Sequence, residues 1–323
     1  MQILGIHHVS ALTANAQKNY DFYADQLGMR LVKKSVNQDS PSMYHLFYAD
    51  EIGRPGTDLT FFEMLGVGHT YRGNNSISET GLRVQDDEAI HFWKKRFEQL
   101  GIKHEPIKTE FGRLVLRFED HESQRLALVS DEDNEGVEAG VPFEHPDIPK
   151  KFGITGLGPV RLTVPKAEHT RQILGSVLTF ENVGSYPARV ENGHDIEVYQ
   201  TGEGGTGAEI QLEERSNLTK EKPGRGSVHH VALRVKSVEE LREVEQKVKA
   251  LRLPTSGVVN RYYFQSLYFR DLNGILFELA TDAPGFLVDE DESTLGEKLA
   301  LPPFLEDKRE QIERQLKPIK MRK

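Results

Sequence analysis

The stretch GIHHVSAL at residues 5–12 recurs as SVHHVALRV at residues 227–235. Both copies place two adjacent histidines near the start of a run rich in Val, Leu and Ala, a composition typical of a β-strand. The same succession of signals follows each copy. Because repetition at this scale defines repeat architectures, the chain is predicted to contain one structural module more than once.

The module that begins at Val228 is the clearer of the two. Ser237, with Glu240 three residues later, is typical of a helix N-terminus, and apolar residues then recur at helical spacing until Pro254. Three further strands are predicted after this helix, at Gly257–Tyr263, Gln265–Arg270 and Ile275–Thr281. The predicted order is strand, helix, strand, strand, strand.

The N-terminal module has the same order. A strand at Gly5–Leu12 precedes a helix that Asn15 caps and Gly28 ends. The strands that follow are predicted at Arg30–Asn37, Ser42–Tyr48 and Thr57–Met64. The last strand of each module carries a glutamate, Glu63 in the first and Glu278 in the last.

Two weaker copies without the double histidine lie between these modules, beginning at Ser78 and Leu157, and the strand after the helix is predicted at Lys103–Phe111 in one and at Phe180–Glu191 in the other. One module alone is small for a core, so paired modules are expected to curl into half-barrels. The predicted class is α+β, with four βαβββ modules paired into two half-barrel domains and a C-terminal helical tail. The predicted domains are 1–135, 150–282 and a tail 283–323 with a helix at Leu305–Leu316.

Composition limits the possible functions. The 323 residues carry a net charge of −9 and include no cysteine, so disulfides and thiolate metal sites are impossible and an acidic surface disfavours nucleic acid. We expect a cytoplasmic protein without a membrane partner, because neither a signal peptide nor a long apolar run is present. Any transition metal must be bound by histidines and carboxylates.

The repeated histidines are the candidate metal ligands. Successive side chains of a strand point to opposite faces, so one histidine of each pair is expected to face the cleft and the other not. The set His8, His230 and Glu278 would supply the two imidazoles and one carboxylate of a facial triad for Fe(II), with positions left open for O₂ and an organic substrate. If Glu63 also binds, the four-ligand set suits Zn²⁺, Ni²⁺ or Co²⁺ acting as a Lewis acid in an isomerase.

The segments GIHHVSALT, YDFYADQLGMRLVKKSVNQDS, YHLFYADEIGRPGTDLTFFEM and VHHVALRV with NRYYFQSLYFRDLNGILFELAT resemble the vicinal oxygen chelate superfamily, and within it the bacterial ring-cleaving dioxygenases that act on hydroquinones. The resemblance implies Fe(II), with Mn²⁺, Zn²⁺ or Ni²⁺ as alternatives, held by the second histidine of each pair and by the glutamate, and a role in aromatic catabolism or detoxification. It also implies supporting roles for four residues: His7, His229, Arg261 and Tyr268.

Three functions follow as hypotheses from this reasoning. The first is an Fe(II)-dependent extradiol-type dioxygenase that uses O₂ to open hydroquinones or related dihydroxybenzenes. The second is a glyoxalase-type metal-dependent isomerase or lyase, and the third is a resistance protein that binds an aromatic compound without turnover. The expected partners are a small aromatic substrate and O₂, and a homo-oligomer remains open.

Overall fold

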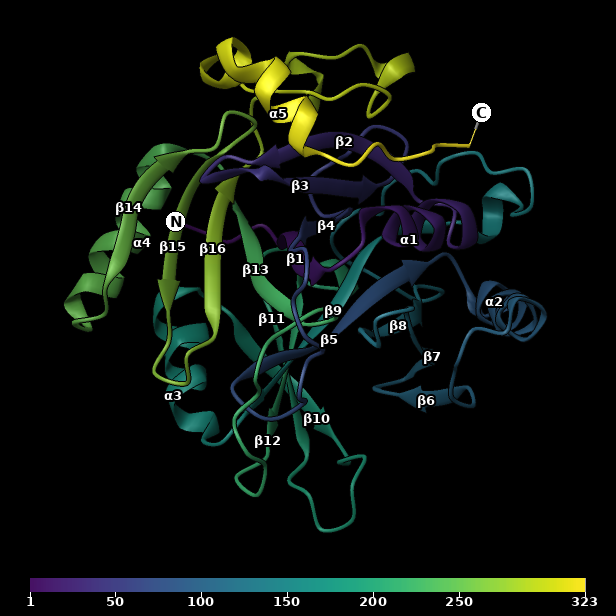
Figure 1. Ribbon diagram of the computed structural model, residues 1–323. Helices are drawn as coiled ribbons and strands as arrows, with labels where there is room; N and C mark the ends of the chain where they lie inside the picture. Colours follow the sequence, from purple (N-terminus) through teal and green to yellow (C-terminus); the bar gives the residue numbers. More distant parts are fainter. Residues whose placement is uncertain (323) are drawn as a thin grey trace.

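Four βαβββ modules follow one another in the computed structural model, which describes residues 1–322 (Figure 1). The first two modules consist of β1 (Ile6–Thr13), α1 (Ala16–Tyr20), β2 (Arg30–Asn37), β3 (Ser40–Ala49) and β4 (Asp58–Glu63), then β5 (Ser76–Val84), α2 (Asp87–Leu100), β6 (Lys108–Glu110), β7 (Arg113–Glu119) and β8 (Arg125–Ser130). The last two consist of β9 (Ile154–Val164), α3 (Ala167–Gln172), β10 (Glu181–Tyr186), β11 (Ile196–Gln200) and β12 (Glu209–Glu214), then β13 (Val228–Val235), α4 (Val238–Ala250), β14 (Thr255–Asn260), β15 (Gln265–Arg270) and β16 (Leu276–Thr281). The predicted class and module order are confirmed.

The strands form two curled sheets of eight, and each sheet combines modules from opposite halves of the chain. One sheet has the order β14-β15-β16-β13-β1-β4-β3-β2, and the other β10-β11-β12-β9-β5-β8-β7-β6. Residues 1–135 and 150–282 therefore each contribute one module to each half-barrel. The first strands of two modules meet in the middle of each sheet, where β1 pairs antiparallel with β13 and β5 with β9.

Side-chain caps and apolar faces explain the helices. Asn15 accepts a hydrogen bond from the Lys18 N–H, and Asp86 accepts one from Ala89, so both helices begin where a polar side chain satisfies a free backbone donor. Each helix buries its apolar face on the convex side of its sheet, as Trp93 and Phe97 of α2 do. In α1 and α3 the helix continues as a wider π-helical turn, over Asp21–Gln26 and Ile173–Val177.

Several strands are shorter than predicted because turns interrupt the apolar pattern. The strand expected at Lys103–Phe111 spans Lys108–Glu110, and that at Phe180–Glu191 spans Glu181–Tyr186. The strand expected at Gly257–Tyr263 ends at Asn260, because Tyr262 adopts a left-handed backbone conformation with φ of 70°. The residues Arg261, Tyr262 and Tyr263 consequently form a turn rather than a strand end.

The tail lies along the edge strand of the first sheet (Figure 1). The Ala300 N–H donates to the Lys34 carbonyl of β2, which covers an edge that would otherwise expose unpaired backbone groups. Lys33 is fully buried and its ammonium contacts Asp289 and Glu290 of the tail. The helix predicted at Leu305–Leu316 is divided into a 3₁₀ segment at Pro303–Lys308 and α5 (Arg309–Gln315).

Candidate metal centre and aromatic cavity

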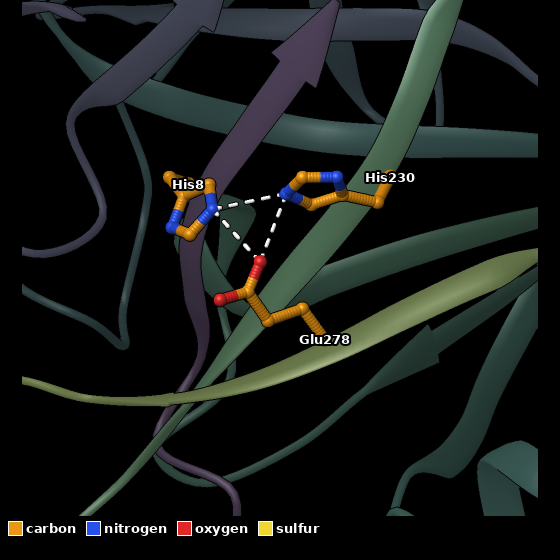
Figure 2. A group of neighbouring side chains, drawn as sticks. All are labelled: His8, His230 and Glu278. Atoms are coloured by element: carbon orange, nitrogen blue, oxygen red, sulfur yellow. Dashed lines mark hydrogen bonds and ion pairs between the residues drawn. The ribbon is translucent and has the colours of Figure 1, made fainter. Parts of the chain in front are cut away.

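Three buried side chains converge from β1, β13 and β16 (Figure 2). The Nε2 atom of His8 lies 3.2 Å from Nε2 of His230 and 3.2 Å from Oε2 of Glu278. Nε2 of His230 lies 2.9 Å from the same carboxylate oxygen. Two imidazoles and one carboxylate thus direct one donor atom each to a common point.

The strand register produces this convergence. His8 stands opposite Ala232 and His230 stands opposite Ser10 in the antiparallel pair of β1 and β13, so the two histidines occupy equivalent positions. In the parallel pair of β13 and β16, Ala232 stands beside Glu278. A central strand from each end of the chain is therefore needed to build the group.

Protonation at this group suits metal binding. Burial alone would raise the pKa of Glu278, but the neighbouring His8 and His230 hold it well below its usual value. The pKa of His230 is lowered, mainly by burial, so that imidazole is neutral. An ionised carboxylate and a neutral imidazole are the forms that bind a metal ion.

The geometry of the group also fits one ion. Metal–ligand bonds of about 2.1 Å meeting at right angles place neighbouring donor atoms about 3 Å apart, close to the observed spacings. Ser266 Oγ lies 2.5 Å from Oε1 of Glu278, whereas Oε2 is buried and makes no well-formed hydrogen bond within residues 1–322. A buried oxygen that faces two imidazole nitrogens is what a metal ligand requires.

The first histidine of each pair supports the second. Nδ1 of His7 lies 2.9 Å from Nδ1 of His8, and Nδ1 of His229 lies 2.8 Å from Nδ1 of His230. One nitrogen of each contact must donate, and this leaves Nε2 of His8 and His230 free to bind a metal when their Nδ1 atoms carry the proton. Burial and the adjacent imidazole lower the pKa of His7 to about 3 and that of His229 to about 4.

The prediction that side chains alternate strictly between the two faces, with one histidine of each pair facing away from the cleft, is wrong for these strands. The register of β1 and β13 shifts by one residue at His7 and again at His229, so each is the additional residue of a bulge. A bulge redirects side chains, which lets neighbouring histidines face each other. His229 lines the cavity, contrary to the expectation that it points away, whereas His7 is buried against the ring of Phe264.

A cavity of about 600 Å³ opens beside the three candidate ligands, within the size range of small-molecule sites. All of its lining comes from the first and fourth modules and the loops that join their strands. Its walls are largely aromatic and aliphatic, and include Leu12, Val36, Met43, Phe47, Phe62, Met64, Tyr263, Phe264 and Leu276. A flat apolar ring is the kind of ligand that such walls accommodate.

Arg261 and Tyr268, the predicted supporting residues, both line this cavity. Nε of Arg261 lies 3.4 Å from the Tyr268 hydroxyl, and the guanidinium carbon lies 5.4 Å from the centre of the Tyr268 ring. Tyr268 stands beside Glu278 in the sheet, and its ring centre lies 5.9 Å from that of His230. Burial raises the pKa of the Tyr268 hydroxyl, so it is a proton donor at neutral pH.

Sequence reasoning missed His45. Its ring lies between Phe47 and Phe62, with ring centres 4.0 Å and 4.1 Å away, and its Nε2 lies 3.0 Å from Thr60 Oγ1. Burial, followed by the neighbouring His8 and His230, lowers the pKa of His45 well below its usual value. A single histidine in β3 has no repeat partner to mark it, although its alternation with the buried Tyr44 and Leu46 would place it on the concave face.

Glu63 lies outside the group. It was expected to occupy the place in the first module that matches Glu278, but Ser10 stands beside Thr60 in the parallel pair of β1 and β4, and this makes Thr60 the equivalent residue. Oε1 of Glu63 instead accepts a 2.8 Å hydrogen bond from the Ala16 N–H at the start of α1. Glu214 makes the same contact with Ala167 in the third module. Glu63 is therefore a helix cap.

The second half-barrel has different residues at the equivalent positions. Its strand register places Glu79, Pro159 and Ala127 where the first half-barrel has His230, His8 and Glu278. Oε2 of Glu79 pairs with Nε of Arg117 at 2.7 Å, and the space there is only about 10 Å³. Within residues 1–322, one half-barrel has an open cavity with a His-His-Glu group and the other is filled by ion pairs.

Paired βαβββ modules with a His-His-Glu group at a buried cavity define a candidate metal-dependent enzyme. The chain belongs to the Glyoxalase/Bleomycin resistance protein/Dioxygenase superfamily, whose family model matches residues 5–128 and 156–279. This confirms the superfamily that the sequence segments indicated.

Curated relatives extend over almost the whole chain. "Putative ring-cleaving dioxygenase MhqA" of Bacillus subtilis (strain 168) is 52% identical over 319 residues, which cover 99% of this chain and 100% of the relative. The chlorohydroquinone/hydroquinone 1,2-dioxygenase of Sphingobium indicum is 26% identical over 316 residues, covering 96% and 95%. A crystal structure of a dioxygenase described as putative, from Bacillus subtilis subsp. subtilis str. 168, has a TM-score of 0.90 at 34% identity and covers 99% of both chains. These similarities place the chain among ring-cleaving dioxygenases.

None of the helices within residues 1–322 combines the length and the apolar character needed to cross a bilayer.

Proposed function

We propose that this enzyme is an Fe(II)-dependent dioxygenase that opens the ring of hydroquinones or related dihydroxybenzenes with O₂. The observation that carries the proposal is the position of His8, His230 and Glu278 in the wall of a cavity lined by aromatic side chains. A facial set of two histidines and one carboxylate leaves open positions on iron. The name of the Sphingobium relative, a hydroquinone dioxygenase, supports the same substrate class.

In this proposal His8, His230 and Glu278 would hold the iron. Bound Fe(II) would supply adjacent sites for a substrate oxygen and O₂ and a route for electrons between them. The paired histidines His7 and His229 would orient the two ligand rings through their Nδ1 contacts.

The remaining cavity residues would bind the substrate and move its protons. The aromatic walls would hold the ring, and a hydroxyl group of the ring would lose its proton as it binds. Nε2 of His45 contacts Thr60 Oγ1, and its Nδ1 makes no hydrogen bond within the described chain, so Nδ1 would accept the proton in the tautomer that has the hydrogen on Nε2. Arg261 would stabilise negative charge that develops on oxygen, and Tyr268 or His229 would return a proton to the opened product.

Thr60 argues against the isomerase alternative, which needs a fourth metal ligand. A fourth ligand from the first module would have to stand at the position equivalent to Glu278, where the chain has a threonine whose hydroxyl contacts His45 and Ser10. The ligand set therefore favours the three-ligand dioxygenase.

An oxygen electrode tests the proposal directly. Protein purified without oxygen and loaded with Fe(II) is expected to consume O₂ with methylhydroquinone, and His230→Ala is expected to abolish uptake and lose bound iron. The methylglyoxal–glutathione adduct is the comparison substrate. Its conversion without O₂ uptake would favour the isomerase, and absence of bound metal with retained aromatic binding would favour a non-catalytic binding protein.

A further inference from the structure

The only guanidinium or ammonium group among the residues that line the cavity, within the described part of the chain, belongs to Arg261. This cation is already paired. Its Nη1 lies 3.0 Å from Oδ2 of Asp39, which also lines the cavity. The Asp39 side chain is 75% exposed, whereas that of Arg261 is 24% exposed, so the acid lies on the solvent side of the pair.

The pairing is built into two loops from opposite ends of the chain. Asp39 lies between β2 and β3, where Asn37 Oδ1 accepts hydrogen bonds from the N–H groups of Asp39 and Ser40 and fixes the turn. The amide of Gln38 donates to the carbonyl oxygen of Arg261 at 2.7 Å. Gln38 therefore holds the backbone of Arg261, and the adjacent Asp39 holds its side chain. Two contacts from one loop indicate that the ion pair is more than a chance surface contact.

This arrangement has a consequence for ligands that carry charge. A ring carboxylate directed toward Arg261, away from the metal group, would meet a cationic side chain that is already paired with Asp39. It would lie near a like charge in a largely apolar wall, and burial of a poorly paired carboxylate is strongly unfavourable. An uncharged substituent such as a methyl group or chlorine at the same ring position carries no charge for Asp39 to repel.

We propose that Asp39 is a specificity-determining residue that restricts the enzyme to uncharged dihydroxybenzenes and excludes those with a ring carboxylate. The proposal rests on the proposed function, because it names the substrate class of the same cavity. Asp39 acts through charge, by occupying Arg261 and by repelling a second anion, and it needs no contact with the reacting atoms.

Methylhydroquinone and 2,5-dihydroxybenzoate are a matched pair of probes, since they differ at one ring position by methyl against carboxylate. The parent enzyme should strongly prefer methylhydroquinone in kcat/KM. Asp39→Asn keeps a side chain that can bond to Arg261 but removes the negative charge, and should lower the preference ratio by about tenfold, as expected for loss of one nearby charge. Asp39→Glu should retain the parent ratio, and so should Asp307→Asn, which removes an exposed acid of the tail outside the cavity lining.

Anaerobic binding of the two probes to the same four proteins measures the selectivity without turnover. Equal affinity of the parent enzyme for both probes would overturn the inference. So would a preference ratio, methylhydroquinone over 2,5-dihydroxybenzoate, that differs by less than twofold between Asp39→Asn and Asp307→Asn. Failure of every protein to consume O₂ with either probe would instead refute the proposed dioxygenase activity, while the binding ratios would still decide the role of Asp39.

Discussion

His8 and His230 are separated by 222 positions in the sequence, yet their Nε2 atoms lie 3.2 Å apart. The pairing of β1 with β13 accounts for this contact, because it joins the first and last modules in one sheet. Glu278 then faces both imidazoles from the neighbouring strand.

Removal of the His230 imidazole or of the Glu278 carboxylate should release the metal. We expect His230→Ala or Glu278→Gln to reduce iron content, measured by elemental analysis, from about one ion per chain to less than about a tenth, because two remaining ligands bind weakly. His194→Ala, at an exposed histidine far from the group in sequence, is the control and should retain its iron. Full iron content in Glu278→Gln would show that this carboxylate is no ligand.

Substitution of Glu63 should affect stability and leave the metal in place. Glu63→Ala removes the acceptor of the Ala16 N–H and should lower the free energy of unfolding by about 1 kcal/mol, the usual cost of a lost helix cap. Glu63→Gln retains an acceptor oxygen and should cost less. Urea denaturation with parallel metal analysis checks both statements, and iron loss in either variant would revive the four-ligand site.

His45 should be needed for turnover but not for metal binding. His45→Gln removes a neutral imidazole from the cavity wall and should lower kcat for methylhydroquinone by about 100-fold, a typical cost of losing a general base. Iron content should remain at the parent level. If kcat is unchanged in this variant, the proton is accepted by another residue, such as His229 or Tyr268.

Asp120 should make stability depend on pH. Burial raises its pKa from 3.8 to about 6 although it accepts hydrogen bonds from the Tyr23 hydroxyl and from two backbone N–H groups. The folded state thus retains a proton that the unfolded chain has released, so this contribution to stability is fully present below about pH 4 and is lost as the pH rises to about 6. The loss amounts to at most about 3 kcal/mol for the corresponding pKa difference.

Denaturation of Asp120→Asn across this pH range tests the assignment. The variant should show a flatter fall in stability between pH 4 and 6 than the parent, and Asp307→Asn should follow the parent curve. Identical slopes in the parent and Asp120→Asn would mean that another group causes the dependence.

Much of the fold, and the convergence of the three candidate ligands, could be predicted because the signal was duplicated. Two histidine pairs at the start of matching strands indicated where the candidate ligands lie, and the family resemblance indicated the second histidine of each pair, His8 and His230, together with Glu278. The one-residue shifts at His7 and His229 could not be predicted, because a bulge depends on how two distant strands align. The same dependence on register explains why sequence spacing indicates Glu63, although Thr60 is the counterpart of Glu278 in the sheet.

His45 and Asp39 illustrate a different limit. Each is a single polar residue without a repeated partner, and its meaning comes from neighbours that tertiary folding supplies, Thr60 and Phe62 for His45 and Arg261 for Asp39. The shortened strand before Arg261 has a similar origin, since the left-handed turn at Tyr262 leaves no clear trace in an apolar pattern. Contacts between loops of different modules are the part of the site that local sequence does not encode.

The nested order of the modules affects how the chain can mature during synthesis. The β5–β12 sheet comes from one continuous stretch, so it can close as soon as that stretch has left the ribosome, whereas β1–β4 must wait for β13–β16. During this interval β1 lacks its antiparallel neighbour, and a nascent polypeptide that stops before β13 carries His8 without either of its partners. The three candidate metal ligands can therefore come together only after β16 has been synthesised.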